Sequence, residues 1–180
     1  MRLYLVRHLQ PMVAPGVCYG RSDLAVDAQL QADAVPALRE QLPTGVAHYA
    51  SPLLRCASLA RALSEHVRFD ARLAELDFGA WEMRSWDVIA RAEIDAWAAD
   101  VSNYRPGGGE SVFDMAIRID AFYADLIRAQ LPAAVLVCHA GAMRLLAARA
   151  RGMDTRAMAQ EAAARPHAIG YGAVVILDSV

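Results

Sequence analysis

Lysine is absent from this 180-residue sequence, in which all 18 strongly basic side chains belong to arginine. Any binding site for an anion must therefore be built from arginine and histidine. The formal net charge is only -2, which excludes an overall positive field that would attract nucleic acid or an anionic membrane surface. We therefore expect neither nucleic acid nor a membrane among the binding partners.

Cysteine is scarce, and long apolar runs are missing. Cys18, Cys56 and Cys138 form no CxxC pair, which argues against a disulfide framework and against a zinc site. No stretch approaches the roughly 18 uninterrupted apolar residues of a membrane span. The start, MRLYLVRH, lacks the order of basic, apolar and small residues that marks a signal peptide. These absences predict a cytoplasmic protein.

Hydrophobic residues, by contrast, make up 56% of the chain, which is enough for a substantial core. The length is that of one compact domain, so we expect a single domain over residues 1–180. Short apolar runs alternate with segments of helical periodicity. This alternation predicts an α/β fold, in which a mostly parallel central sheet is covered by helices on both faces as a three-layer αβα sandwich.

The expected elements follow from these patterns. Strands are predicted at 2–8, 46–51, 133–139 and 172–177, and helices at 28–42, 51–66, 86–101, 112–126 and 140–152. Ser51 is expected as the N-cap of the second helix, with Pro52 at its first position.

Two of the predicted strands end in a histidine. One apolar run leads directly to Arg7 and His8, and another leads to His139. A cation and an imidazole at the end of a buried strand are costly unless they meet a partner or a ligand. Because ligands of parallel sheets bind beyond the carboxyl ends of the strands, we expect both imidazoles to converge on one crevice. Arg55, in the first turn of the helix after the second strand, is expected at the same rim.

This constellation fits a phosphoryl group. Two guanidinium groups repel each other unless an anion lies between them, and the planar fork of arginine suits phosphate. The helix expected to begin at Ala140 adds backbone N–H donors and a favourable dipole. Arginine and protonated histidine can stabilise a transferring phosphoryl group by themselves, so we expect neither a metal nor a cofactor.

The remaining chemistry needs a nucleophile and an acid. Imidazole can attack phosphorus, and covalent transfer divides one difficult step into two easier ones. A carboxylic acid near the phosphate can then protonate the leaving oxygen. Glu75 and Glu82, in the apolar stretch ELDFGAWE, are both candidates for this acid.

Six motifs together resemble a known family. LYLVRH, YGRSDL, SPLLRCASLA, ELDFGAWE, PGGGES and VCHAG occur in the order found in the histidine phosphatase, or phosphoglycerate mutase-like, superfamily. The short length and the loop motifs resemble its α-ribazole phosphatase branch, which removes the 5′-phosphate of α-ribazole during cobalamin biosynthesis. The resemblance implies a phosphoglycerate mutase-like fold and a metal-independent phosphomonoesterase that acts through a phosphohistidine intermediate.

The resemblance also implies roles for individual residues. His8 matches the family nucleophile that becomes phosphohistidine. Arg7 and Arg55 match the arginines that clamp the phosphate, and His139 matches the second histidine, which contacts the phosphoryl oxygens. The expected substrate is a small phosphomonoester, α-ribazole 5′-phosphate; the sequence does not predict an oligomeric state.

Two further matches and two departures concern the loops. Glu75 matches the family acid, and Arg21 matches an arginine of the first loop that reaches the substrate. Leu9 and Met83 stand where the family commonly has glycine. If position 9 requires a positive φ, Leu9 would be strained. Both departures lie on loops that face the substrate, so they concern specificity more than chemistry.

Other functions stay open at this point. A broad-specificity sugar-phosphate or nucleotide phosphatase of the same superfamily is the first alternative. A metal-dependent oxygenase or hydrolase would use His8, His139 and Glu75 as a two-histidine, one-carboxylate set, although the neighbouring Arg7 would repel the metal ion. A phosphate-binding module that has lost catalysis is the third. A mutase generally needs a longer chain to enclose a bisphosphate.

Overall fold

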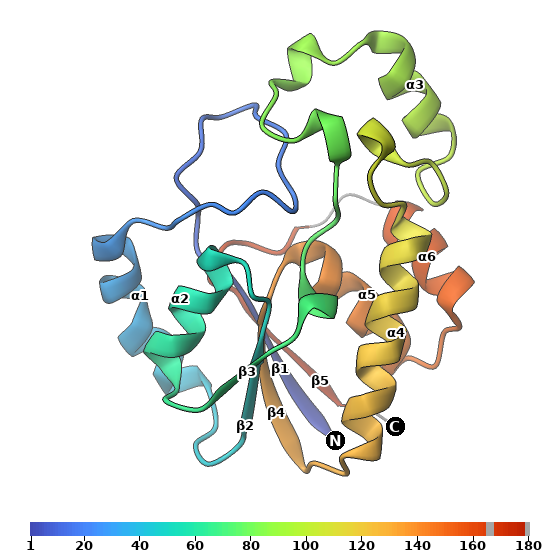
Figure 1. Cartoon of the computed structure of the whole chain (residues 1–180). Coiled ribbons are helices and arrows are strands. Elements are labelled where there is room, and N and C mark those ends of the chain that lie inside the picture. The colour runs from blue at the N-terminus through green and yellow to red at the C-terminus, as the bar shows by residue number, and fades with distance from the viewer. Residues whose placement is uncertain (165–167, 179–180) are drawn as a thin grey trace.

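The computed structural model describes residues 1–164 and 168–178 and contains a five-stranded sheet of order β3-β2-β4-β1-β5 (Figure 1). β4 runs parallel to both of its neighbours, β1 and β2, and β3 runs parallel to β2. Only the edge strand β5 is antiparallel. The expected α/β fold with a mostly parallel sheet is confirmed.

The elements have the following bounds. The strands are β1 (Arg2–Arg7), β2 (Ala47–Ala50), β3 (Val67–Phe69), β4 (Ala133–Cys138) and β5 (Val174–Asp178). The helices are α1 (Ala28–Gln41), α2 (Leu54–Leu63), α3 (Arg91–Ala99), α4 (Val112–Arg128), α5 (Ala140–Ala150) and α6 (Thr155–Ala164). Short 3₁₀ turns lie at Ala71–Leu73, Gly79–Trp81, Trp86–Val88 and Pro106–Gly108.

The central strand β4 is buried on both faces, which explains its uninterrupted apolar sequence. Its alternating side chains belong to two separate cores. Val135 and Val137 pack with apolar residues of α1 and α2, whereas Ala134, Leu136 and Cys138 pack with those of α4, α5 and α6. Helices therefore cover both faces of the sheet, with α1 and α2 on one side and α4 to α6 on the other (Figure 1).

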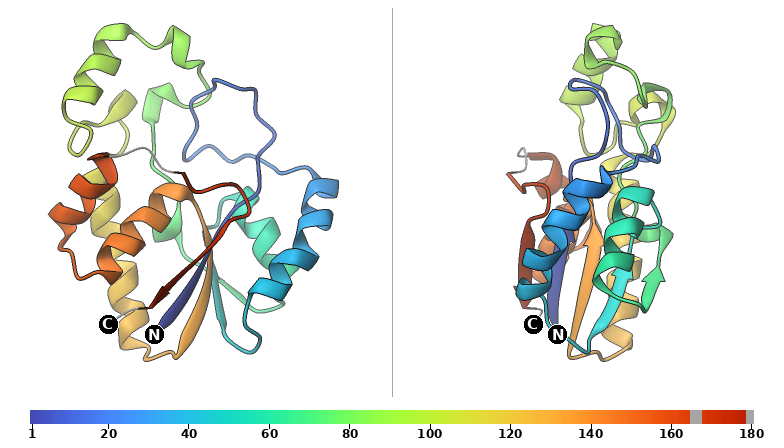
Figure 2. Two further views of the ribbon diagram at one scale, coloured as in Figure 1. Left: turned by 180° about the vertical axis from the view of Figure 1, so that it is seen from behind. Right: turned by 90° about the vertical axis from the view of Figure 1, so that its left-hand side faces the viewer.

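Residues 77–110, here called the cap, stand beyond the carboxyl ends of the parallel strands (Figure 2). The cap has its own small aromatic core. Trp81 is fully buried there, and the rings of Trp86 and Trp97 stack with their centroids 5.8 Å apart. Trp81 Nε1 donates a hydrogen bond of 2.6 Å to Glu93. This packing orders the cap, which lies above the edge of the sheet where a ligand is expected.

Two expected helix boundaries are wrong. α2 begins at Leu54, with Leu53 as its N-cap, and the hydroxyl of Ser51 turns inward instead. The helix expected at 86–101 is interrupted at Ile89, whose backbone is extended and whose side chain is buried in the core of the cap. In both cases a tertiary contact prevails over the local pattern. No helix within the described residues is long and apolar enough to cross a membrane.

Candidate active site

The two imidazoles converge at the carboxyl edge of the sheet. β1 and β4 are parallel neighbours in which Arg7 lies opposite Cys138, so the residues that follow each strand emerge side by side. The ring centroids of His8 and His139 are 5.0 Å apart, and the rings meet at 61°. The expected meeting of the two strand ends is therefore observed.

His8 is held in one tautomer. Its ring is almost completely buried, and Nδ1 lies 2.6 Å from the carbonyl oxygen of Leu9. Because a carbonyl can only accept, Nδ1 carries the hydrogen and Nε2 keeps the lone pair. Burial is the main cause that lowers the pKa of His8 to about 3; the hydrogen bond to Leu9 opposes it, and the charges of Arg55 and Arg7 add to it. The ring is thus neutral and nucleophilic at physiological pH.

His139 caps the N-terminus of α5 and is fully buried. Its Nε2 lies 2.9 Å from the hydroxyl of Ser51 and 3.4 Å from the sulfur of Cys56. Burial, followed by the charge of Arg55, lowers the pKa of His139 well below its ordinary value. The ring packs against His8 but is not among the residues that line the adjoining cavity.

The two arginines beside His8 have no anionic partner among the residues that the structure describes. Arg55, fully buried, donates hydrogen bonds to the carbonyl oxygens of Gly20 and Ser22 at 2.5 and 2.7 Å. Arg7 donates to the carbonyl oxygen of Ile169. Within residues 1–164 and 168–178 neither arginine forms an ion pair, and the Nε atom of each is buried without a hydrogen-bond partner. Two such charges are best compensated by an anionic ligand.

Glu75 lies at the start of α5. Its Oε2 accepts a hydrogen bond of 3.1 Å from the backbone N–H of Gly141, and its Oε1 accepts one of 3.0 Å from Leu76. Glu75, Ala140 and Gly141 line the same cavity as His8. The structure therefore brings together a neutral imidazole, a helix N-terminus, one carboxyl group and two guanidinium groups that form no ion pair within the described residues.

Arg21 lies outside this group. It does not line the cavity, and its side chain is about half exposed and pairs with Asp77 at 3.5 Å. The backbone next to it is held by Glu82, whose carboxylate accepts hydrogen bonds from the N–H groups of Gly20, Arg21, Ser22 and Phe78 and from the Ser22 hydroxyl.

Glu82 therefore holds the backbone of residues 20–22, which belong to the loop between β1 and α1, here called the first loop. Burial opposes its ionisation, but the hydrogen bond from Ser22 and those from the backbone hold the pKa of Glu82 below its ordinary value. The loop that it holds presents the two carbonyl groups to which Arg55 donates. An ionised carboxylate with five donors is a poor source of protons, so we keep Glu75 alone as the candidate acid.

Two tyrosines complete the rim, and sequence reasoning missed both. Tyr171 lies under Arg7, whose guanidinium carbon is 4.0 Å from the ring centroid, and its hydroxyl is 2.7 Å from that of Tyr19. Both rings line the cavity. The motif CYGRSDL contains Tyr19 and could have signalled it, whereas Tyr171 follows the last motif and carries no local signal.

Away from the polar cluster, the cavity is apolar. It has a volume of about 620 Å³ and passes between the sheet edge and the cap. Its apolar wall consists of Leu76, Phe78, Trp97, Val101, Val112, Met115, Leu145 and Ala162. Arg144 is the remaining charged residue in the lining. A ligand here would place a phosphoryl group against arginines and the rest of the molecule against apolar side chains.

The alternative metal site is not supported by the geometry. Within the described part of the chain, no three His, Cys, Asp or Glu side chains are grouped so that they could hold one metal ion. His8, His139 and Glu75, which that hypothesis required, therefore form no such set.

The two departures from the family pattern differ in their backbones. Among described residues other than glycine, only Met83 and Gln130 have a positive φ, so the strain expected at Leu9 is absent. Leu9 is instead buried in the core that includes α1 and α2. Met83 does adopt the left-handed conformation, with a φ of 61°, and its side chain is exposed.

A family model and individual relatives both match most of this sequence. A family model described as the histidine phosphatase superfamily (branch 1) matches residues 3–170. The adenosylcobalamin/α-ribazole phosphatase of Escherichia coli (strain K12) is 30% identical over 173 residues, which are 88% of this chain and 83% of that protein. A probable phosphoglycerate mutase, GpmB, of Citrobacter koseri is 30% identical over 166 residues, which are 85% of this chain and 76% of that protein.

Solved structures agree with this result. The α-ribazole phosphatase of Shigella flexneri superposes with a TM-score of 0.83 and 26% identity, covering 99% of this chain and 90% of that one. A mycobacterial glucosyl-3-phosphoglycerate phosphatase superposes with a TM-score of 0.81 and 26% identity, covering 97% and 88%. These relatives carry names with different substrates.

Proposed function

The chain belongs to the histidine phosphatase superfamily, and we propose that it hydrolyses α-ribazole 5′-phosphate, without a metal ion, through a phosphohistidine formed on His8. The observation that carries the chemistry is the neutral His8 ring, fixed by Leu9 in a cavity that it shares with Arg7 and Arg55, for which the described residues provide no carboxylate partner. In this proposal Nε2 of His8 attacks phosphorus while the bond to the leaving oxygen breaks.

The surrounding residues take complementary roles in the same proposal. Arg7 and Arg55, with the N-terminus of α5 at Ala140, stabilise the charge on the phosphoryl oxygens. Glu75, in its protonated form, gives a proton to the leaving alkoxide, and the resulting carboxylate then takes a proton from the water that hydrolyses the phosphohistidine. His139 packs against His8 and limits the motion of its ring.

The apolar wall supports α-ribazole over a sugar phosphate. The benzimidazole base of α-ribazole is flat and apolar, so it can pack against Phe78, Trp97 and Leu145. Phe78 and Leu145 offer no hydrogen bonds to a sugar, so each hydroxyl group placed against them would lose water without compensation. Trp97 offers one donor, its Nε1, which has no partner among the described residues. The names of two of the relatives point to the same substrate.

A substrate screen tests the substrate. α-Ribazole 5′-phosphate, ribose 5-phosphate, a purine nucleotide and 3-phosphoglycerate are compared by kcat/KM in the presence of EDTA. We expect activity to persist with EDTA and α-ribazole 5′-phosphate to be preferred by at least tenfold. Trp97→Ala should reduce that preference, because it removes part of the apolar wall. Equal kcat/KM values for all four compounds would support the broad-specificity alternative instead.

A separate experiment tests the intermediate. Rapid quenching with ³²P-labelled substrate should trap acid-labile label on the wild-type protein and none on His8→Ala. A wild-type protein that binds phosphate but never becomes labelled would indicate the phosphate-binding module without turnover.

A further inference from the structure

Residues 72–77, here called the Glu75 segment, contain the proposed acid but little regular structure. The 3₁₀ turn Ala71–Leu73 ends early in the segment, and residues 75–78 lie in neither helix nor strand. Carbonyl groups in such a stretch have no partner in a helix or sheet and must find donors elsewhere. The position of Glu75 therefore depends on what holds this backbone.

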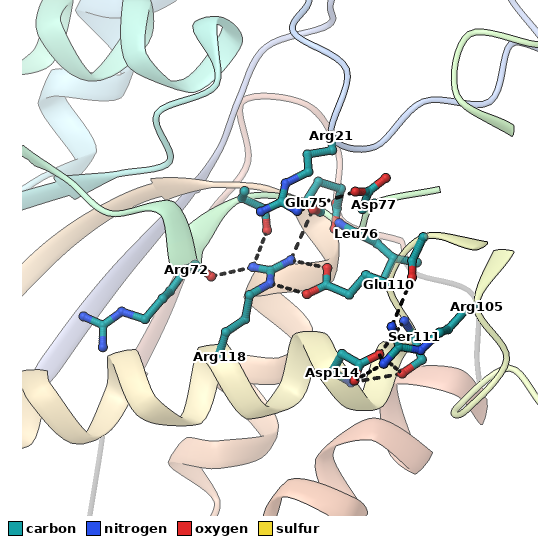
Figure 3. A network of polar contacts seen from close by, with 12 residues as sticks. Arg21, Arg72, Glu75, Leu76, Asp77, Arg105, Glu110, Ser111, Asp114 and Arg118 are labelled. Carbon is teal, nitrogen blue, oxygen red and sulfur yellow. Dashed lines mark hydrogen bonds and ion pairs between the residues drawn. The ribbon is translucent and has the colours of Figure 1, made fainter. Parts of the chain in front are cut away.

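Arg118, on α4, supplies most of the donors. Its Nη1 donates to the carbonyl oxygens of Arg72 and Ala74 at 2.5 and 2.7 Å, and its Nη2 donates to that of Glu75 at 3.2 Å. Figure 3 shows the guanidinium lying between these carbonyl groups on one side and Glu110 on the other.

Glu110 orients that guanidinium. Its two carboxylate oxygens accept from Nε and Nη2 of Arg118 at 2.7 and 2.8 Å, and both side chains are about 15% exposed. All five N–H groups of the Arg118 guanidinium therefore donate a hydrogen bond: two to Glu110 and three to carbonyl groups of the Glu75 segment. The backbone N–H of Glu110 also donates to the carbonyl oxygen of Asp77 at 2.8 Å. Together the pair holds four carbonyl groups of one short segment.

We propose that Arg118, oriented by Glu110, is a positioning residue that fixes the acid Glu75 against the N-terminus of α5. This inference rests on the proposed function, since it concerns the efficiency of the proton donor. The Glu75 carboxyl group meets the N–H groups of Leu76 and Gly141 only while its own backbone stays in place. A displacement of about 1 Å can cost on the order of a hundredfold in rate.

Stability alone does not explain this pair. A shielded ion pair contributes little net stability compared with apolar side chains of similar volume, because both charges lose water. Lysine cannot replace the arginine, because three donors on a single nitrogen cannot reach a carboxylate and three separate carbonyl groups. The planar guanidinium of Arg118 points its N–H groups in several directions, which lets it bind three carbonyl groups of the Glu75 segment at once.

The test compares leaving groups in Arg118→Lys. kcat/KM is measured for p-nitrophenyl phosphate, whose leaving group needs little protonation, and for the alkyl phosphate that the wild type hydrolyses best. We expect the alkyl-to-aryl ratio of kcat/KM to fall about tenfold, which is less than the roughly 10²–10⁴-fold that a general acid contributes, because the acid is displaced and not removed. The matched control is Arg149→Lys. Arg149, on α5, pairs with Asp120 of α4, the helix that carries Arg118, and no hydrogen bond joins it to the Glu75 segment within the described residues. Its ratio should stay within twofold of the wild type.

The outcomes separate this inference from the proposed function. Equal slowing of both substrates by Arg118→Lys, or a lower Tm with an unchanged ratio, would show a purely structural role and overturn the inference while the phosphatase activity stands. A wild-type protein that hydrolyses neither compound would overturn the proposed function itself. If Arg118→Lys does not fold, Glu110→Gln decides, because it keeps the shape of the pair; its ratio should fall in the same direction, and an unchanged ratio would overturn the inference.

Discussion

Gly141 leaves room for the carboxyl group of Glu75 at the start of α5. A Cβ atom at position 141 would lie 2.3 Å from Glu75 Oε1, which is far inside contact distance. The obstructing atom is the end of a flexible side chain, so the carboxyl group can move away without disturbing the backbone. A substitution here therefore acts on Glu75 more than on the fold.

Gly141→Ala should accordingly separate activity from stability. Alanine favours a helix by up to about 1 kcal/mol relative to glycine, so Tm should stay the same or rise. At the same time, kcat/KM for alkyl phosphates should fall about tenfold or more, because the proposed acid loses its place. Thermal unfolding and steady-state kinetics measure the two effects. A variant with full activity on alkyl phosphates would show that Glu75 need not contact the helix N-terminus.

Met83 bears a conformational cost that glycine would avoid. Its φ of 61° lies in the left-handed region, and its exposed side chain gains little from packing. That conformation costs about 1–2 kcal/mol for a residue with a Cβ, partly offset by the greater freedom of glycine in the unfolded chain. Met83→Gly should therefore stabilise the protein by about 0.5–1 kcal/mol in urea denaturation. Met12→Gly, at an exposed position without a positive φ, is the control and should give no gain.

At the level of elements, Glu82 connects the cap to the first loop. Its carboxylate holds the backbone of residues 20–22, and the carbonyl groups of Gly20 and Ser22 receive Arg55. Loosening this loop would free a guanidinium of the proposed phosphate site, whereas Glu75 would be unaffected.

Glu82→Gln should therefore lower kcat/KM for aryl and alkyl phosphates by the same factor. Loss of a preorganised charged donor costs about 3 kcal/mol when it is complete; since Arg55 is only loosened, we expect about tenfold. The kinetic constants of the two substrate classes check this. A fall confined to alkyl phosphates would instead place Glu82 in the proton transfer that we assign to Glu75.

The elements also show what the sequence could and could not predict. β1 and β4 are predictable because uninterrupted apolar runs end abruptly at Arg7 and at His139. β3 spans only three residues and is held by pairing with β2, so its own sequence carries no strand signal. α6 was not expected either, because its alanine-rich segment buries only Met158 and Ala159. In both cases the neighbours determine the element.

The same distinction holds for the site. Arg7, His8 and Arg55 stand out because charged groups follow or flank buried strands. Arg118 does not stand out: it lies on the long helix α4 between apolar positions and resembles any solvated charge. Its partners are carbonyl groups more than 40 residues away, which no periodicity reveals.

At the scale of the whole molecule, the fold keeps two imidazoles neutral inside a positively charged site. His8 is 3% exposed and His139 is fully buried. Burial is the first cause of both lowered pKa values, and Arg55 adds to each. In the unfolded chain the same groups titrate near pH 6.5. The unfolded state therefore binds more protons than the folded state as the pH falls below that value.

Stability should consequently decrease with acid before the carboxylates begin to titrate. Below about pH 6.5 the free energy of unfolding falls by up to about 1.4 kcal/mol per pH unit for each imidazole that stays neutral in the folded state. For His8 this continues until its folded pKa of about 3. Urea denaturation at pH 7, 6 and 5, in phosphate-free buffer, measures the slope. This slope is proportional to the number of protons that the chain takes up on unfolding. His8→Gln and His139→Gln should each lower that number by about one. A wild-type slope that neither substitution changes would mean that both rings titrate normally in the folded protein, contrary to the neutral nucleophile on which the proposed reaction depends.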